Sequence, residues 1–149
     1  MPEPFFAPLR LETLVRLAGI GQLLLVAASP AIPKVLGWRE ELAGNVRPLT
    51  REVFWTWAGY IWMSHMAFGL LSTFGPGLLV DRTPLAGLVS AFIATWWGAR
   101  IVIQFTYFDR TAAPPGRIYK LGEVALVTLF AVLVSVYATV AYLDLRSLG

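Results

Sequence analysis

Few side chains in this chain of 149 residues could do chemistry, and His65, its one histidine, stands inside a long apolar stretch. An ionisable group inside a bilayer is costly, so it is by default a candidate functional site. On a helical projection His65 shares a face with Ala58, Gly69 and Ser72, so we expect it to point into a helix bundle. It could ligate haem or a metal, relay protons, or form a structural hydrogen bond between helices. Bis-histidine haem would need a second histidine from another copy of the chain.

Arg100 is the second candidate, with Gln104 one helical turn later on the same face. Trp96 is among the aromatic residues that flank this face. An arginine, a glutamine and flat rings could hold an anionic headgroup, a quinone or a carboxylate. Two structural alternatives stay open, because Arg100 could pair with Glu123 or extend its charged end to the membrane surface.

Two further positions belong to the candidate ligand-binding set. Gln22 lies at a depth from which it could meet Gln104. Trp62 and Trp96, with Trp97, are too deep in their helices for the usual interfacial belt of tryptophans, which suggests contact with a hydrophobic ligand.

The sequence lacks the residues that several classes of chemistry require. The chain has no cysteine, which excludes disulfides, thiolate metal sites and cysteine nucleophiles. It carries no phosphate-binding glycine loop and no paired carboxylates within its apolar stretches, so no catalytic residue is predicted. The formal net charge of +3 comes from the predicted loops, which favours contact with anionic lipids over binding to nucleic acid.

Composition places these residues in a membrane. The chain is 57% hydrophobic and only 14% charged, whereas a soluble domain has about 25% charged residues. Four stretches without charge, each close to the length of a membrane-spanning helix, divide the sequence. We therefore predict an all-α polytopic membrane protein, a four-transmembrane-helix bundle forming one domain over residues 1–149, with helices at about 9–29, 50–73, 84–108 and 118–143.

The connections carry their own predictions. Residues 32–42 could form a short interfacial helix, although an ordinary charged loop is an equal alternative. Thr50 is expected to cap the second long helix with Pro48 just outside it, and Thr83 and Pro84 to begin the third. The Gly75-Pro76-Gly77 run is expected to end the second helix.

Loop charges and small residues predict orientation and packing. The first and third loops hold more lysine and arginine than the termini and second loop, which favours both termini outside. A ridge of small residues on the third long helix, opposite Arg100, is expected to pack closely against another helix or a partner protein or second copy. Its members are Gly87, Ala91, Thr95 and Ala99.

Three runs resemble those of small, uncharacterised bacterial four-helix integral membrane proteins: residues 32–42 (IPKVLGWREEL), 68–72 (FGLLS) and 104–110 (QFTYFDR). The resemblance implies location in a bacterial inner membrane. It carries no activity and no site residue.

The sequence thus favours a non-catalytic membrane protein, either an accessory or assembly subunit or a binder of lipid or another hydrophobic molecule. One alternative is a redox subunit that binds haem or quinone through His65 or the face of Arg100 and Gln104. A second alternative is a small transporter or channel.

Overall fold

The computed structural model describes residues 6–108 and 116–147, and within them every regular element is a helix. Three helices are short: α2 (Ala31–Val35), α3 (Trp38–Asn45) and α5 (Pro76–Leu79). The four long helices agree with the predicted ranges to within a few residues, and they are α1 (Phe6–Ala28), α4 (Pro48–Phe74), α6 (Pro84–Thr106) and α7 (Arg117–Arg146). The all-α prediction is confirmed for the described residues.

The predicted start of α6 is correct and that of α4 is wrong. The backbone amide of Ala86 donates to the Thr83 hydroxyl at 3.2 Å, and Pro84 is the first helical residue. In α4, Pro48 is itself the first residue, and Thr50 lies inside the helix rather than capping it. Proline suits that position because the first amides of a helix have no partner within the helix in any case.

The segment predicted as one interfacial helix forms two. Gly37 adopts a left-handed backbone conformation with φ of 65° between α2 and α3. Glycine takes this conformation at little cost, and it turns the chain sharply. After Gly75 the expected turn contains the short helix α5.

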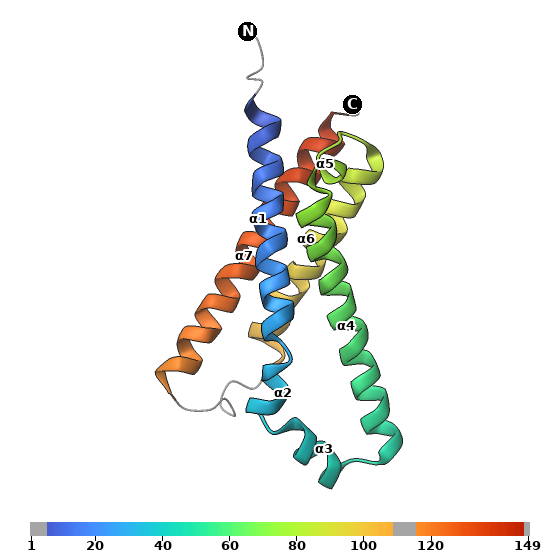
Figure 1. Ribbon diagram of the computed structural model, residues 1–149, viewed down its shortest axis with the longest axis vertical. Helices are drawn as coiled ribbons and strands as arrows, with labels where there is room; N and C mark the ends of the chain where they lie inside the picture. The colour runs from blue at the N-terminus through green and yellow to red at the C-terminus, as the bar shows by residue number, and fades with distance from the viewer. Residues whose placement is uncertain (1–5, 109–115, 148–149) are drawn as a thin grey trace.

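The long helices form two antiparallel pairs, α1 with α4 and α6 with α7 (Figure 1). Small residues allow close approach within each pair. Gly19 on α1 lies against Thr73 of α4, where an added Cβ would come within 2.7 Å of the Thr73 backbone nitrogen. Gly87 on α6 likewise lies against Leu145 of α7.

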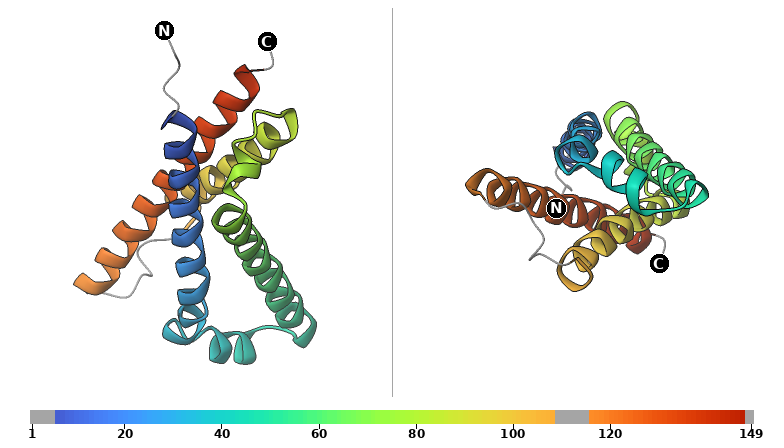
Figure 2. Two further views of the ribbon diagram at one scale, coloured as in Figure 1. Left: turned by 45° about the horizontal axis from the view of Figure 1, so that its top comes forward. Right: turned by 90° about the horizontal axis from the view of Figure 1, so that it is seen from below.

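The four long helices lie closer together toward one end of the molecule, the packed end, and spread apart toward the other, where α1 and α4 also diverge (Figures 1 and 2). The beginning of α1 and the end of α7 lie at the packed end, while α2 and α3 bridge the lower ends of α1 and α4 at the open end (Figures 1 and 2). Contacts of α1 with α7, and of α5 with α1 and α6, connect the two pairs. The open end is where the structure leaves room between helices.

Within the described residues, three helical segments are long and apolar enough to span a membrane: Arg10–Val35, Pro84–Thr106 and Arg117–Arg146. Their outward side chains are large and apolar, as in Leu24, Leu88 and Val124, and polar side chains such as Gln22 lie inside. This distribution suits a hydrocarbon environment. Helix α4 has 27 residues, the length of a span, but it is not among these three segments.

The predicted ridge on α6 is only partly a packing surface within this chain. Gly87 is buried, but Thr95 and Ala99 are exposed. The face that packs on α7 is instead Ala86, Gly87, Ser90, Ile93, Ala94 and Trp97. Trp97 replaces the small residues because its ring fills the wide space between the two helix pairs. Thr95 satisfies its own hydroxyl by donating to the Ala91 carbonyl at 2.8 Å. A partner protein or second copy on the exposed residues of the ridge stays a prediction.

Candidate functional site

His65 points into the bundle, as its helical face predicted. Its ring stacks on Trp97 of α6, with centroids 4.6 Å apart and an interplanar angle of 27°. The indole Nε1 of Trp96 donates to His65 Nε2 at 3.0 Å. Two adjacent tryptophans therefore hold the imidazole of α4 against α6.

The hydrogen bond from Trp96 fixes the form of the imidazole. An indole N–H can only donate, so Nε2 accepts and carries no proton, and the neutral ring carries its proton on Nδ1. No described residue makes a hydrogen bond with Nδ1. His65 thus keeps one free N–H donor.

Below the packed end of the bundle, a buried polar network joins all four long helices. Gln22 of α1 donates from Nε2 to the Tyr137 hydroxyl of α7 at 2.6 Å, and its Oε1 accepts from Trp97 Nε1 of α6 at 3.1 Å. The Ser72 hydroxyl of α4 lies 2.5 Å from the same Tyr137 oxygen. All four side chains are fully buried. Gln22 therefore meets Tyr137 and Trp97 rather than Gln104, the partner that the sequence allowed.

Arg100, Gln104 and Glu123 form a second chain of contacts between α6 and α7. Arg100 Nη1 donates to Gln104 Oε1 at 3.1 Å, and Gln104 Nε2 donates to Glu123 Oε1 at 3.4 Å. The Arg100 guanidinium also lies 5.0 Å from the ring centroid of Phe108 and 5.6 Å from that of Phe130. The predicted association of Arg100 with Glu123 thus runs through Gln104. Aromatic rings and a carboxylate both stabilise a positive charge in this position.

The larger cavity of the open end has a volume of about 550 Å³ and lies between α4 and the α1–α3 corner. We call it the tryptophan groove. It runs from α2 and α3 to His65, and the indole of Trp62 donates to the Val26 carbonyl at 3.0 Å beside it. Its walls are almost wholly apolar and include Pro33, Trp38, Phe54, Trp55, Trp57, Ala58, Gly59, Ile61, Trp62 and His65.

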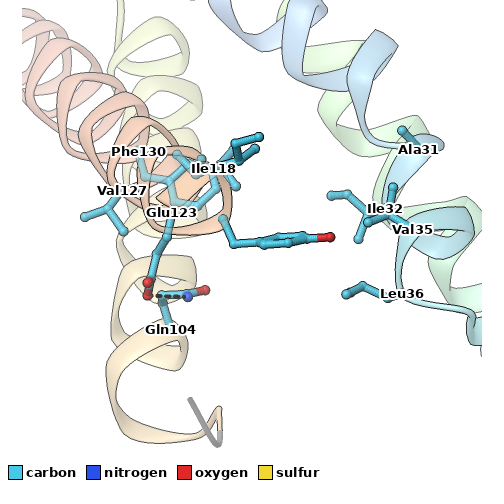
Figure 3. Close-up of a pocket in the computed structure, with 12 residues that line it drawn as sticks. Ala31, Ile32, Val35, Leu36, Gln104, Ile118, Glu123, Val127 and Phe130 are labelled. Atoms are coloured by element: carbon cyan, nitrogen blue, oxygen red, sulfur yellow. Dashed lines mark hydrogen bonds between the residues drawn. The ribbon is translucent and has the colours of Figure 1, made fainter. Parts of the chain in front are cut away.

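A smaller cavity of about 350 Å³, the glutamate groove, lies between α2 and the α6–α7 pair. Figure 3 shows Gln104 and Glu123 bonded to each other on one wall, and apolar side chains of α2 on the opposite wall. Ile32 lines both grooves, so α2 separates them. The labelled residues of the α2 wall are Ala31, Ile32, Val35 and Leu36.

The predicted site residues therefore divide among three places. His65 and Trp62 line the tryptophan groove, and Trp96, which does not line it, donates to His65. Gln104 and Glu123 line the glutamate groove, and Arg100 donates to Gln104. Gln22 belongs to the buried network. The structure does not bring His65 and the Arg100 face into one cavity, because His65 lines the tryptophan groove whereas Gln104 lines the glutamate groove.

Sequence reasoning missed two buried polar residues on α7. Tyr137 is fully buried. Its position in the middle of a long apolar stretch was the available signal. Asp144 is fully buried two residues before the end of α7, and neither carboxylate oxygen has a hydrogen-bond partner of ordinary geometry. The charges that act on it are those of Arg82 and Asp81, in the turn before α6.

The described residues contain no group of three or more histidine, aspartate or glutamate side chains that could hold a metal ion. Comparison with protein-family models, curated proteins and solved structures finds no match.

Proposed function

We propose that this chain is a non-catalytic integral membrane protein that binds a lipid or another hydrophobic molecule in its open end. One observation carries the proposal: an aromatic groove of about 550 Å³ lies beside a bundle whose interior is otherwise closed by hydrogen bonds. Cavities of about 300 to 1,000 Å³ with apolar walls and few polar groups are typical of sites for small molecules.

The proposal takes α4 as the fourth membrane span. Its 27 residues give about 40 Å at 1.5 Å per residue, more than the roughly 30 Å of hydrocarbon in a bilayer. His65 of α4 lines the groove and the Ser72 hydroxyl contacts Tyr137 of α7, so their polarity is compatible with a span. Four spans put the start of α1 and the end of α7 on the same side, which agrees with their positions in Figure 1. By the distribution of positive charge, that side is the outer one.

An apolar groove at this depth cannot hold ordered water, because water needs polar partners. A hydrophobic molecule from the bilayer fills it instead. The tryptophan rings supply large, rigid contact surfaces at a small cost in side-chain freedom, which favours a retained ligand over exchanging bulk lipid.

Three glycines make a matched test, because a Cβ atom added at Gly44, Gly59 or Gly122 would meet nothing within 4 Å. Gly59 lines the tryptophan groove, Gly122 lines the glutamate groove, and Gly44 lies in α3 outside both. We expect Gly59→Phe to reduce the hydrophobic molecules that stay bound through purification, as measured by native mass spectrometry and solvent extraction. Gly44→Phe should retain them.

The same variants show which groove is used. Loss of ligand in Gly122→Phe with retention in Gly59→Phe would move the site to the glutamate groove. Wild-type protein that carries no lipid or other hydrophobic molecule, and takes none up from vesicles, would refute the proposal. Brominated phospholipids give a second measurement, since a bromine inside the groove quenches the fluorescence of Trp55, Trp57 and Trp62.

The haem alternative has less support in the geometry. Coordination of haem iron through His65 Nε2 would break the hydrogen bond from Trp96. An absorption spectrum of the purified protein tests it directly, because a Soret band lost in His65→Ala would establish haem.

A further inference from the structure

We propose that the occupant of the tryptophan groove is a lipid-soluble quinone, whose ring carbonyl accepts a hydrogen bond from His65 Nδ1. This inference rests on the proposed function, because it requires that the groove bind a hydrophobic molecule. It adds the chemistry of that molecule and the atom that recognises it.

The first step is the unused donor. Trp96 occupies Nε2 and leaves the proton on Nδ1, and no described residue accepts from that atom. His65 lines the groove, whereas Trp96 and Trp97 do not, so the part of the ring that reaches the cavity is the part turned away from Trp96. The two ring nitrogens point to nearly opposite sides, which directs Nδ1 toward the groove.

The second step is the cost of that donor in hydrocarbon. An N–H group without an acceptor is expensive where no water can bind it. The lining of the tryptophan groove otherwise contains indoles, the already bonded Ser29 hydroxyl and apolar side chains. A ligand that brings an uncharged acceptor oxygen to His65 removes the cost, and a pure hydrocarbon chain does not.

The third step is the depth of His65 in the membrane, which selects among ligands that carry an uncharged acceptor oxygen. At 1.5 Å per residue, His65 lies about 6 Å past the midpoint of α4, and therefore about 20 Å from the surface of the hydrocarbon core at the α2–α3 end. The ester oxygens of a phospholipid that enters from that end stay at the surface. A fatty acid would have to bury its carboxylate. A quinone carries neutral carbonyl oxygens on a ring that is itself soluble in hydrocarbon.

The shape of the walls agrees with this selection. Trp57, Trp62 and Ile61 line the part of the groove on the same helix as His65. Flat aromatic rings pack well against a flat quinone ring in offset or edge-to-face arrangements. The remaining length toward Pro33 and Trp38 on α2 and α3 accommodates an apolar tail.

The experiment compares two probes with the same tail on delipidated protein in detergent: decyl-ubiquinone, which has ring carbonyls, and decylbenzene, which has none. Binding of the quinone is followed by the quenching of tryptophan fluorescence. Binding of decylbenzene is followed by its competition with brominated lipid, which restores that fluorescence. We expect His65→Phe to lower the affinity for decyl-ubiquinone by about 5- to 10-fold, which is the effect of losing one neutral hydrogen bond. Decylbenzene should bind both proteins equally. His65→Asn keeps an N–H donor near the position of Nδ1, so its affinity for the quinone should stay within about twofold of wild type.

An infrared difference spectrum keeps the test independent of the variants' folding. In wild-type protein one carbonyl band of bound decyl-ubiquinone should lie below its frequency in hexane, as expected for a hydrogen-bonded carbonyl. An unshifted band, equal binding of both probes to wild type, or unchanged quinone affinity in His65→Phe would overturn the quinone assignment. Each of these results would leave a general hydrophobic ligand in place. If neither probe nor brominated lipid bound, the proposed function itself would fail.

Discussion

Tyr137→Phe removes one oxygen atom from the buried network and nothing else. That oxygen accepts from Gln22 and contacts the Ser72 hydroxyl, and all three side chains are fully buried. In the variant the Gln22 amide and the Ser72 hydroxyl each lose a partner where no water replaces it. Two interhelical hydrogen bonds, at roughly 0.6 to 1.7 kcal/mol each in membrane proteins, give an expected loss of about 1 to 3 kcal/mol.

The measurement is reversible unfolding in mixed micelles with an increasing fraction of dodecyl sulfate, followed by tryptophan fluorescence and circular dichroism. Tyr142→Phe is the matched control, because the Tyr142 hydroxyl is on the same helix but exposed, with only a 3.4 Å contact from Arg146. We expect that control to change stability by less than about 0.5 kcal/mol, as is usual for a surface substitution.

A double-mutant cycle with Ser72→Ala tests whether the two groups act together. Once Tyr137 has lost its hydroxyl, the Ser72 hydroxyl has no partner, so its removal should cost less in Tyr137→Phe than in wild type. Equal stability of the Tyr137→Phe and Tyr142→Phe proteins, or strict additivity with Ser72→Ala, would refute a coupled network between α4 and α7.

Three further outcomes follow from the packing and the topology. Gly19→Ala should cost about 1 to 3 kcal/mol by overpacking against α4, whereas Gly59→Ala, which meets nothing within 4 Å, should not destabilise the protein in the same micelle titration. The chain has no cysteine of its own, so the single variants Asn45→Cys and Asp81→Cys can each be labelled in intact cells. A membrane-impermeant maleimide should label only Asp81→Cys, and equal labelling of both variants would contradict α4 as a span. Arg100→Lys should lower stability by about 0.5 to 2 kcal/mol, because a lysine loses the planar contact with two rings; an unchanged midpoint in thermal unfolding would show that those contacts contribute little.

The helices were predictable because membrane helices are determined locally. Long uncharged stretches, the Thr83–Pro84 start and the run at Gly75 depend only on nearby residues, and the structure places the long helices close to those predictions. The start of α4 was predicted wrongly because two nearby residues, Thr50 and Pro48, both signal the start of a helix. Thr50 is a good cap, but Pro48 is compatible with the first turn of a helix and extends α4.

The inward direction of His65 was also predictable, since one helical face gathers the small residues Gly69 and Ser72. Its partner was not. The Trp96 hydrogen bond joins residues of two different helices, and the choice depends on how α4 crosses α6. The same dependence explains why Trp97, and of the predicted ridge only Gly87, is buried in this chain. Small residues indicate close packing, but a tryptophan that finds an acceptor in Gln22 and a stacking partner in Phe130 fills the interior better.

The sequence by itself determined that this chain is helical, that its outer surface is apolar, and that a few polar groups lie within its spans. Backbone hydrogen bonding and the thickness of a bilayer force that outcome whatever the detailed packing. Only the tertiary structure decided that Gln22 meets Tyr137 in the interior, that α2 separates two grooves, and that Trp96 donates to His65 beside the larger groove. These features depend on the angles between helix pairs, which arise from contacts between residues far apart along the chain.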